Sequence, residues 1–351
     1  MSAAGPTWSS CYKLVKESRS LQQQSTKRLP HDFVFTSKHG NDVRMYFLAE
    51  VPGRSDDTIY LCDVPSSLLP VAVDVDSAAN APLSNLEAFR LIEARDAKLL
   101  GHPTREEQLL RERQRIVAYG ITSYEHDNNS GRIVFPAAGQ LYSINDSHRT
   151  NNGVDSTFGP LLPEEVPLPR SSFNAGSAAM FPSICPADPN FVAYVLNKNI
   201  YVTSKYNNTI SQLTFENSAL DKFAGTPSYI IQEEFDRYLA LWWNPAKHAD
   251  SIYLLYETVD EGRVELVNLP SHSADFVPRS EPFRFARAGT SNASCQLQLC
   301  KISYDGTQHH HEPSDSHQHL TIRQLKLAQP LKEIWPEFEY LIRAGWANEE
   351  L

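Results

Sequence analysis

The chain has 351 residues, of which 41% are hydrophobic and 21% are charged. These proportions are ordinary for a globular protein and argue against wholesale disorder. The net charge of −10, without a basic stripe interleaved with aromatic residues, argues against nucleic acid as a partner. No apolar run approaches the length of about 18 residues that a membrane span needs. The first residues also lack the basic start and apolar stretch of a secretory signal, so we expect a cytoplasmic protein without a membrane partner.

The cysteine content agrees with a reducing compartment. Five cysteines are few for a chain of this length, and an odd number cannot all be paired in a disulfide framework. We therefore expect free thiols at Cys11, Cys62, Cys185, Cys295 and Cys300.

The first part of the chain is predicted to hold an N-terminal arm, residues 1–30, and a segment of strands and one helix, residues 31–116. The arm mixes an amphipathic patch with a polar, glutamine-rich run, which predicts a frayed helix or a docking arm. Alternating residues over 43–49 and 58–64 predict two strands of a hairpin-like unit. Beyond them, apolar residues recur at helix-like spacing at Leu86, Phe89 and Ile92.

The clearest helix signal begins at Thr104. Threonine is a favourable N-cap residue, and Glu107 stands three residues later, as a capping box requires. Glu106 adds negative charge at the positive end of the helix dipole. The following residues, 108–116, are rich in strong helix formers, so the sequence predicts a well-defined helix here.

From residue 117 to residue 351 the sequence is dominated by short β-rich runs separated by Gly, Asn, Asp and Pro. Many short strands at close spacing predict a sandwich, a barrel or a propeller. The predicted strands are 120–124, 132–135, 140–144, 191–196, 199–203, 210–215, 238–243, 251–257 and 263–269. Two stretches, 145–176 and 307–318, are predicted to be long loops.

Two adjacent carboxylates, Glu233 and Glu234, lie in an otherwise apolar and aromatic segment. On an extended strand their side chains would point to opposite faces, whereas on a helical turn both could converge. Converging carboxylates repel one another unless a cation lies between them. The α-ammonium group of a peptide, with a pKa of about 7.7–8.0, is such a cation, and two carboxylates can accept its hydrogens. This interpretation fails if the carboxylates point apart or if a basic side chain of the protein neutralises them. The alternative is an exposed pair of solvated acids.

Several segments of the chain resemble the dipeptidyl peptidase IV family of serine peptidases, in particular its cytosolic dipeptidyl peptidase 8/9-like group. The segment 231–238, followed by Trp242 and Trp243, is similar to the double-glutamate motif of that family. Ala286 stands where the family usually has proline, which puts the geometry of one turn in doubt. The other similar segments occur in the family's order and extend the likeness from about residue 25 to the end: 31–35, 105–115, 120–124, 184–189, 255–261 and 340–346.

The resemblance implies a mainly β fold, an incomplete β-propeller preceded by a short region with one well-defined helix. In that family the double glutamate lies on a short helical excursion of the propeller and binds the free N-terminus of the substrate. Glu233 and Glu234 match it. An arginine from the helix before the propeller holds a substrate carbonyl, and Arg115 matches it as the last basic residue of its helix. The alternative for Arg115 is a solvated helix face, because Arg111 and Arg113 flank it.

Hydrolysis in that family needs a Gly-x-Ser-x-Gly nucleophile elbow and a later Asp and His in an α/β-hydrolase domain. No such elbow occurs in the sequence, so we expect no catalytic residue, no hydrolase domain and no activity of this chain alone. It is interpreted as the substrate-gating propeller part of a post-proline dipeptidyl aminopeptidase. The alternative is a non-enzymatic peptide-binding or regulatory module. The expected partners are peptides with Xaa-Pro or Xaa-Ala N-termini and, second, a full-length relative.

No cofactor and no metal ion are expected. The histidines at 309, 310, 311, 317 and 319 lie in a polar stretch without a cysteine partner, which favours a solvated loop over a metal site. Asp236 and Arg237 are predicted to form a local ion pair that orients the glutamate turn. Tyr238, Trp242 and Trp243 are predicted to belong to the core.

Overall fold

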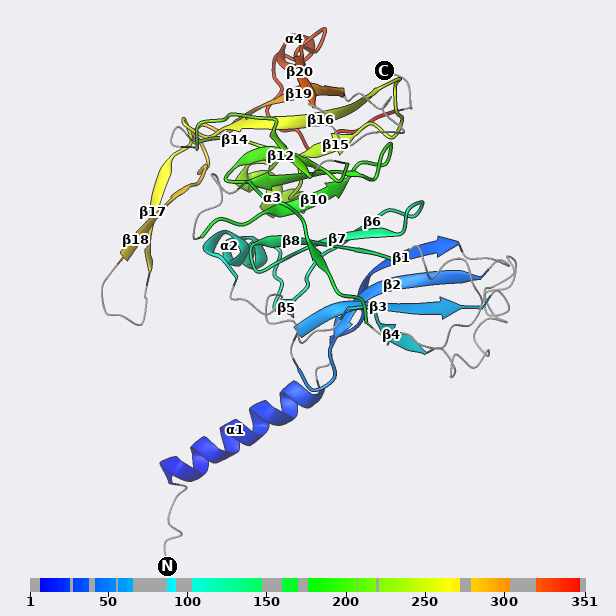
Figure 1. Cartoon of the computed structure of the whole chain (residues 1–351). Helices are drawn as coiled ribbons and strands as arrows, with labels where there is room; N and C mark the ends of the chain where they lie inside the picture. The colour runs from blue at the N-terminus through cyan, green and yellow to red at the C-terminus, as the bar shows by residue number, and fades with distance from the viewer. Residues whose placement is uncertain are drawn as a thin grey trace, which may run out of the picture. The chain divides into compact units, whose positions relative to one another are not determined.

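A computed structural model of the chain (Figure 1) consists of two compact units. Unit 1 comprises residues 1–94, 118–122 and 156–160, and unit 2 comprises residues 95–117, 123–155 and 161–351. The structure describes residues 7–25, 28–37, 42–54, 56–65, 87–92, 103–146, 160–169, 176–206, 208–218, 221–271, 279–303 and 320–347.

Among its described residues, unit 1 contains one helix and one sheet. The helix is α1 (Trp8–Ser25), and the strands are β1 (His31–Ser37), β2 (Val43–Glu50), β3 (Asp56–Val64), β4 (Ala88–Arg90) and β5 (Tyr119–Gly120). The two predicted hairpin strands are confirmed, because β2 and β3 pair antiparallel over their length.

The helix-like spacing around Phe89 does not correspond to a helix in the described residues. Phe89 lies in strand β4, where it pairs with Leu61 of β3, and Ile92 is fully buried just after the strand. Leu86 lies outside the described residues. Three apolar residues at intervals of three are too short a pattern to separate a helix from a strand, and pairing with β3 decides the conformation.

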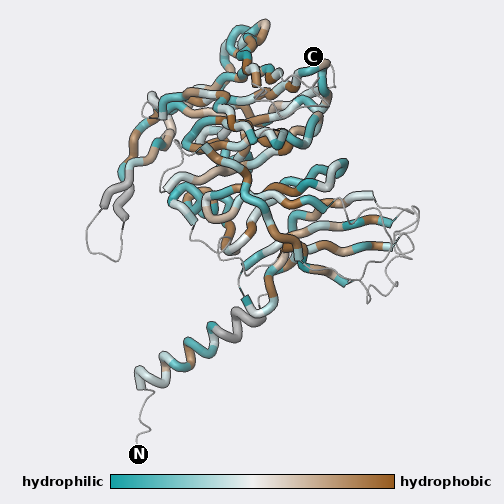
Figure 2. Tube along the Cα trace, in the orientation of Figure 1, coloured by the Kyte–Doolittle hydropathy of each residue, from teal (hydrophilic) through white to brown (hydrophobic). Residues whose placement is uncertain are grey.

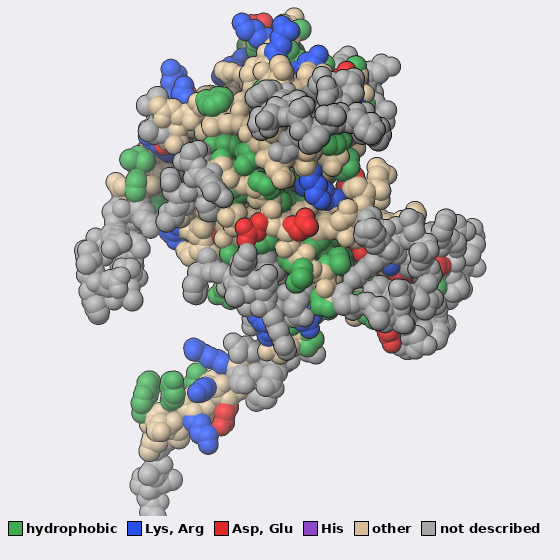
Figure 3. Space-filling view, viewed as in Figure 1, with side chains coloured by type: hydrophobic (Ala, Val, Ile, Leu, Met, Phe, Trp, Pro, Cys, Tyr) green, Lys and Arg blue, Asp and Glu red, His purple; other side chains and the backbone are tan. Residues whose placement is uncertain are grey.

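Helix α1 agrees with the first of the two alternatives for the N-terminal arm, a helix. It exposes four large hydrophobic side chains, and basic side chains also project from it (Figure 3). The exposed hydrophobic residues are Trp8, Tyr12, Leu14 and Val15. Among the residues that the structure describes, neither this helix nor any other combines the length and apolar character of a membrane span.

In the part that the structure describes, unit 2 consists of antiparallel sheets with three short helices, α2 (Arg105–Arg113), α3 (Tyr229–Phe235) and α4 (Leu331–Ile334). The first sheet has the order β6-β7-β8-β9, the second β10-β11-β12-β13, and the third β14-β16-β19-β20 with β15 paired to β16. Strands β17 and β18 form a separate hairpin. The strands are β6 (Glu125–His126), β7 (Arg132–Ala137), β8 (Gln140–Asn145), β9 (Glu164–Glu165), β10 (Met180–Ile184), β11 (Phe191–Leu196), β12 (Asn199–Ser204), β13 (Thr209–Gln212), β14 (Lys222–Ala224), β15 (Leu241–Trp243), β16 (Ser251–Asp260), β17 (Leu266–Ser271), β18 (Arg279–Arg284), β19 (Ser294–Ser303) and β20 (Thr321–Leu325).

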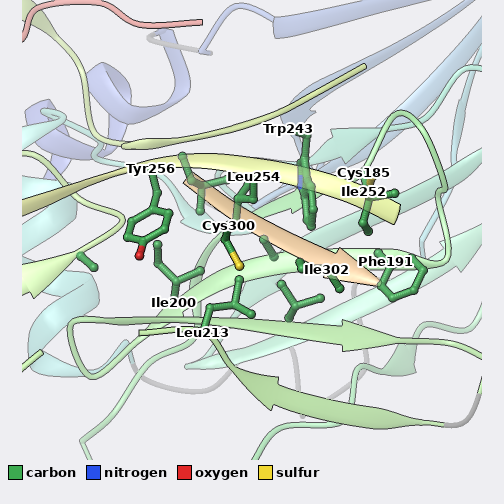
Figure 4. Packing of buried hydrophobic residues seen from close by; sticks show 14 of the residues in the cluster. Cys185, Phe191, Ile200, Leu213, Trp243, Ile252, Leu254, Tyr256, Cys300 and Ile302 are labelled. Carbon is green, nitrogen blue, oxygen red and sulfur yellow. The ribbon is translucent and has the colours of Figure 1, made fainter. Parts of the chain in front are cut away.

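The sheets of unit 2 pack face to face. All six residues of β11 are buried because its sheet lies between two others. Phe191, Ala193 and Val195 belong to the core shared with the third sheet (Figure 4). The alternate residues Val192, Tyr194 and Leu196 belong to the core shared with the first sheet. Successive side chains of a strand point to opposite faces, so a strand that is buried on both sides is an unbroken apolar run. Figure 2 shows hydrophobic segments, in brown, among the strands of this unit.

This stacking confirms the predicted fold class. The chain is mainly β, and the successive antiparallel sheets of unit 2 are consistent with an incomplete β-propeller. Most predicted strands are present, but the strand predicted at 120–124 is reduced to β5, which ends at Gly120. The predicted division at residues 30 and 116 stays a prediction. All five cysteines are free, as predicted.

Helix α2 begins as its sequence predicts. The Thr104 hydroxyl accepts the Glu107 N–H, and one Glu107 carboxylate oxygen accepts the Thr104 N–H at 2.6 Å. The other oxygen accepts the N–H of Gly139 at 2.8 Å, at the tip of the β7–β8 hairpin. The capping glutamate therefore fixes the position of α2 on the first sheet as well as capping the helix.

Candidate functional site

The two adjacent glutamates lie on helix α3, not on a strand. Both residues lie within α3, so the helical alternative for the pair is the correct one. The strand predicted at 238–243 begins only at Leu241. The chain enters α3 through Gly225, whose φ of +81° and lack of a side chain are both required. A Cβ there would lie 2.8 Å from side-chain atoms of Ile200 and Val195.

The carboxylates of α3 occupy the electrostatically unfavourable end of the helix. Glu233 and Glu234 are in its last turn, and Asp236 caps it in the left-handed conformation with φ 48°. The negative end of the helix dipole disfavours acidic groups, so an added cation is favoured here. Successive helical residues are about 100° apart, so the two glutamates do not point to opposite faces.

The two glutamates differ in their surroundings. The Glu233 side chain is 28% exposed, and its Oε1 accepts a hydrogen bond from Nη2 of Arg115 at 2.8 Å. Glu234 is exposed and has no hydrogen bond or ion pair within the described part of the chain. A basic side chain of the protein therefore pairs with Glu233, so the condition stated for failure of the interpretation is met at this carboxylate but not at Glu234.

Arg115 stands in a strained position at the end of α2. Its φ is 56°, in the left-handed region that disfavours residues with a side chain. The N–H of Ile116 donates to the Arg111 carbonyl and the N–H of Arg115 donates to the Glu112 carbonyl, which together form a Schellman motif. Glycine is the usual residue at this position of the motif, so an arginine costs backbone strain that its side chain must offset.

Arg113 joins α2 to α3, a role that the sequence did not reveal. Its Nη1 donates to the Gln232 side chain at 2.9 Å, and its guanidinium lies 5.6 Å from the centre of the Tyr229 ring. The Tyr238 hydroxyl donates to the Arg113 carbonyl at 3.2 Å. Arg113 and Arg115 thus both contact α3. The alternative for Arg115, a solvated helix face, stays a prediction, because the Arg115 side chain is 79% exposed.

The predicted ion pair between Asp236 and Arg237 is wrong. Asp236 is exposed at the left-handed turn, where it accepts a long hydrogen bond of 3.4 Å from Tyr238. Arg237 is buried instead, and its Nη2 donates to Glu257 and to the Leu341 carbonyl, both at 2.7 Å. The left-handed residue reverses the chain direction, so neighbours in sequence face solvent and core respectively.

The buried Arg237–Glu257 pair holds the end of α3 in place. Burial raises the pKa of the Glu257 carboxyl, and the adjacent guanidinium opposes this rise. Glu257 lies in β16 at the centre of the third sheet, and Leu341 belongs to the C-terminal segment. Removing one partner from such a pair leaves a buried charge without compensation, which is strongly destabilising.

The aromatic predictions are only partly correct. Trp243 is a core residue, and its indole N–H donates to the Ser183 carbonyl at 3.1 Å. Tyr238 is not a core residue, because it is half-buried and its hydroxyl lies at the junction of α2 and α3. Burial is the largest cause of the raised pKa of Tyr238, and the nearby acids Asp236 and Glu233 add to it. Trp242 is half-buried beside the Arg237 guanidinium.

Metal ligation has no support in the part of the chain that the structure describes. No group of three or more His, Cys, Asp or Glu residues is arranged there to hold an ion. The predicted solvated histidine stretch lies outside the described residues.

The arrangement offers two poles to a ligand. Glu234 and Glu233 present negative charge, and Arg115 presents a permanent planar cation beside them. A ligand that carries a positive group close to a carbonyl oxygen could pair the positive group with the carboxylates and the carbonyl oxygen with the guanidinium.

Two family comparisons cover most of the chain. Residues 141–350 match the family described as "Dipeptidyl peptidase IV (DPP IV) N-terminal region". Residues 4–117, which include Arg115, match the family described as "Dipeptidyl peptidase 8 and 9 N-terminal".

Curated relatives agree with these matches. The chain is 28% identical to human Dipeptidyl peptidase 8 over 358 residues, which covers 98% of this chain and 37% of the relative. It is 29% identical to Dipeptidyl aminopeptidase B of Saccharomyces cerevisiae over 170 residues, covering 46% of this chain and 20% of the relative. Bovine Dipeptidyl peptidase 4 is 27% identical over 115 residues, covering 32% and 14%. The chain thus spans little more than a third of the length of the human relative.

Proposed function

Because the chain belongs to the dipeptidyl peptidase IV N-terminal region family, we propose that it binds the free N-terminus of peptides for a post-proline dipeptidyl aminopeptidase. Glu233 and Glu234 accept the hydrogens of the α-ammonium group, and Arg115 donates to a carbonyl oxygen of the same peptide. Gating follows from this geometry, because only a chain end carries the ammonium group. The chemical step belongs to a hydrolase domain of the complete enzyme.

One observation carries the proposal. Arg115 and Glu233 are separated by 118 residues in sequence, yet their charged groups lie 2.8 Å apart on an exposed face. Glu234 stands next to them without a partner in the described residues. Two acids and one arginine on neighbouring helix ends form a site for a dipeptide end.

The existing ion pair is compatible with this role. The Arg115 side chain is 79% exposed, and an exposed pair contributes only about 0–1 kcal/mol. A peptide ammonium group can therefore replace Arg115 at Glu233 at little cost. The released guanidinium then becomes available to the peptide carbonyl.

The test is binding of a matched pair of peptides to the purified chain, measured by titration calorimetry. An Ala-Pro peptide with a free N-terminus should bind, and the same peptide with an acetylated N-terminus should show no measurable binding. Equal binding of the two peptides would remove Glu233 and Glu234 from the site.

A second assay concerns the chemical step. We expect no hydrolysis of a Gly-Pro chromogenic substrate by this chain alone. If hydrolytic activity stays with the chain through further purification, the assignment of the hydrolytic step to another domain is contradicted.

A further inference from the structure

The ion pair of Arg115 is too weak to hold the end of α2 beside α3. The Arg115 side chain is exposed, and exposed pairs contribute little to stability. The left-handed backbone of Arg115 adds strain rather than support. In the proposed function the pair also breaks, because a peptide ammonium group replaces the guanidinium at Glu233. Other contacts must therefore keep α2 in place while the peptide binds.

The side chain of Arg113 makes one such contact. Its Nη1 donates to Oε1 of Gln232 at 2.9 Å, and its guanidinium lies 5.6 Å from the centre of the Tyr229 ring. Gln232 is buried, and its Nε2 donates to the Pro227 carbonyl at 2.8 Å, which fixes the orientation of the amide group. A hydrogen bond from a charged donor is stronger than a neutral one, and partial burial strengthens it further.

The backbone of Arg113 makes a second contact. Its carbonyl lies in the last turn of α2, where carbonyl groups have no partner within the helix. The hydroxyl of Tyr238 donates to this carbonyl at 3.2 Å and lies farther, at 3.4 Å, from a carboxylate oxygen of Asp236. Tyr238 follows α3 in the chain and is half-buried. The side chain and the carbonyl of Arg113 are therefore both held by α3 or by the residues that follow it.

An acid near Arg113 favours its charged form. Burial is the largest cause of the raised pKa of Glu261, and the guanidinium of Arg113 is among the charges that oppose this rise. The interaction between Arg113 and Glu261 is therefore attractive. An amide oxygen, an aromatic ring and a carboxyl group thus all act on the Arg113 guanidinium, so it is held more firmly than the exposed side chain of Arg115.

The start of α2 is fixed separately. Glu107 caps the helix and also accepts the N–H of Gly139 in the first sheet. The helix is therefore held at its start by Glu107 and near its end by Arg113. Only Gln114 separates Arg113 from Arg115, so the contacts of Arg113 fix the backbone directly before Arg115.

We propose that Arg113 is a positioning residue of the peptide site and that it acts through Arg115. Its contacts with Gln232 and Tyr238 hold the last turn of α2 against α3. The Arg115 side chain can then leave Glu233 for a peptide carbonyl while its backbone stays beside the two glutamates. The inference rests on the proposed function.

The first test replaces Arg113 by methionine, which removes the guanidinium and keeps an apolar side chain. Affinity for an Ala-Pro peptide is measured by titration calorimetry. We expect Arg113→Met to weaken binding about tenfold, and by no more than Arg115→Ala does, because only the contribution of Arg115 is lost. Lys332→Met is the matched control: it removes one positive charge at an exposed position of α4 and should leave the affinity unchanged.

A double variant separates positioning from an independent contribution to binding. Once Arg115 is alanine, a residue that acts through it has nothing left to position. Arg113→Met/Arg115→Ala should therefore bind the peptide as tightly as Arg115→Ala alone. If the losses of the two single variants add, Arg113 acts independently of Arg115 and the proposal is overturned.

Folding is checked by chemical unfolding of each variant. If Arg113→Met does not unfold cooperatively, Tyr238→Phe takes its place in both tests, because it removes a single hydroxyl group. Its expected loss of affinity is about threefold, as for one neutral hydrogen bond, and this loss should again vanish when Arg115 is alanine.

The outcomes distinguish this inference from the proposed function. If the folded Arg113→Met variant binds the peptide as tightly as the unmodified chain, and acetylation of the peptide still abolishes binding, the positioning role alone is overturned. If acetylation has no effect on binding to the unmodified chain, the proposed function itself is overturned.

Discussion

Replacing Arg115 by glycine should separate its structural cost from its role in binding. The residue has φ 56° at the Schellman position of α2, where glycine is the usual residue. A left-handed residue with a side chain costs about 1–2 kcal/mol, and glycine removes this strain. Against this, glycine adds about 0.5–1 kcal/mol of chain entropy to the unfolded state. The lost exposed pair with Glu233 adds about 0–1 kcal/mol.

The free energy of unfolding of Arg115→Gly should therefore lie within about 1 kcal/mol of the unmodified chain. Arg115→Ala is the matched control, because it also loses the guanidinium but keeps the left-handed strain. It should be less stable than Arg115→Gly by about 1 kcal/mol. Chemical unfolding followed by tryptophan fluorescence measures both differences.

Peptide affinity should respond differently from stability. Both variants should weaken binding of an Ala-Pro peptide by the same factor, roughly tenfold to a hundredfold, because each loses one hydrogen bond from a charged donor. The reasoning is refuted if Arg115→Gly binds the peptide as well as the unmodified chain. It is also refuted if Arg115→Gly is less stable than Arg115→Ala, because the strained backbone would then have another cause.

Two further predictions concern the support of the site, and a third concerns the charge of the ligand. Arg237→Met leaves Glu257 buried without its partner, so the free energy of unfolding should fall by about 3–5 kcal/mol; a fall below about 1 kcal/mol would contradict the buried geometry. Gly225→Ala places a side chain at a φ of +81° and brings its Cβ within 2.8 Å of Ile200. We therefore expect the free energy of unfolding to fall by about 2–4 kcal/mol. An unchanged midpoint of chemical unfolding would be incompatible with this backbone. Peptide affinity should decline as the pH rises through about 8, where the free α-ammonium group loses its proton; calorimetry at pH 7 and pH 9 checks it, and constant affinity would speak against a charged ligand group.

Local chemistry made the helix at Thr104 predictable. The N-cap and Glu107 lie within one helical turn, and the structure contains the predicted capping box. Strand β11 was predictable because burial on both faces makes it an unbroken apolar run, Phe191–Leu196. Strand β19 was missed although its apolar and polar residues alternate, as at Leu297 and Gln298, which is the pattern of a half-buried strand.

The candidate site was predictable only in part. The pair Glu233 and Glu234 stands out as a sequence pattern, and resemblance drew attention to Arg115. The error at Arg237 came from pairing neighbours in sequence, whereas the left-handed Asp236 turns the arginine into the core. The link between Arg113 and Gln232 spans 119 residues, and nothing local in the sequence indicates it.

A thermodynamic cycle between the peptide ammonium group and the two carboxylates tests the account most directly. Its four titrations combine the unmodified chain and Glu233→Gln/Glu234→Gln with an Ala-Pro peptide and its des-amino analogue, in which hydrogen replaces the ammonium group. The account predicts a coupling energy of about 1.5–3 kcal/mol, because the variant should no longer distinguish the two ligands. A coupling energy near zero would show that these glutamates do not hold the peptide N-terminus.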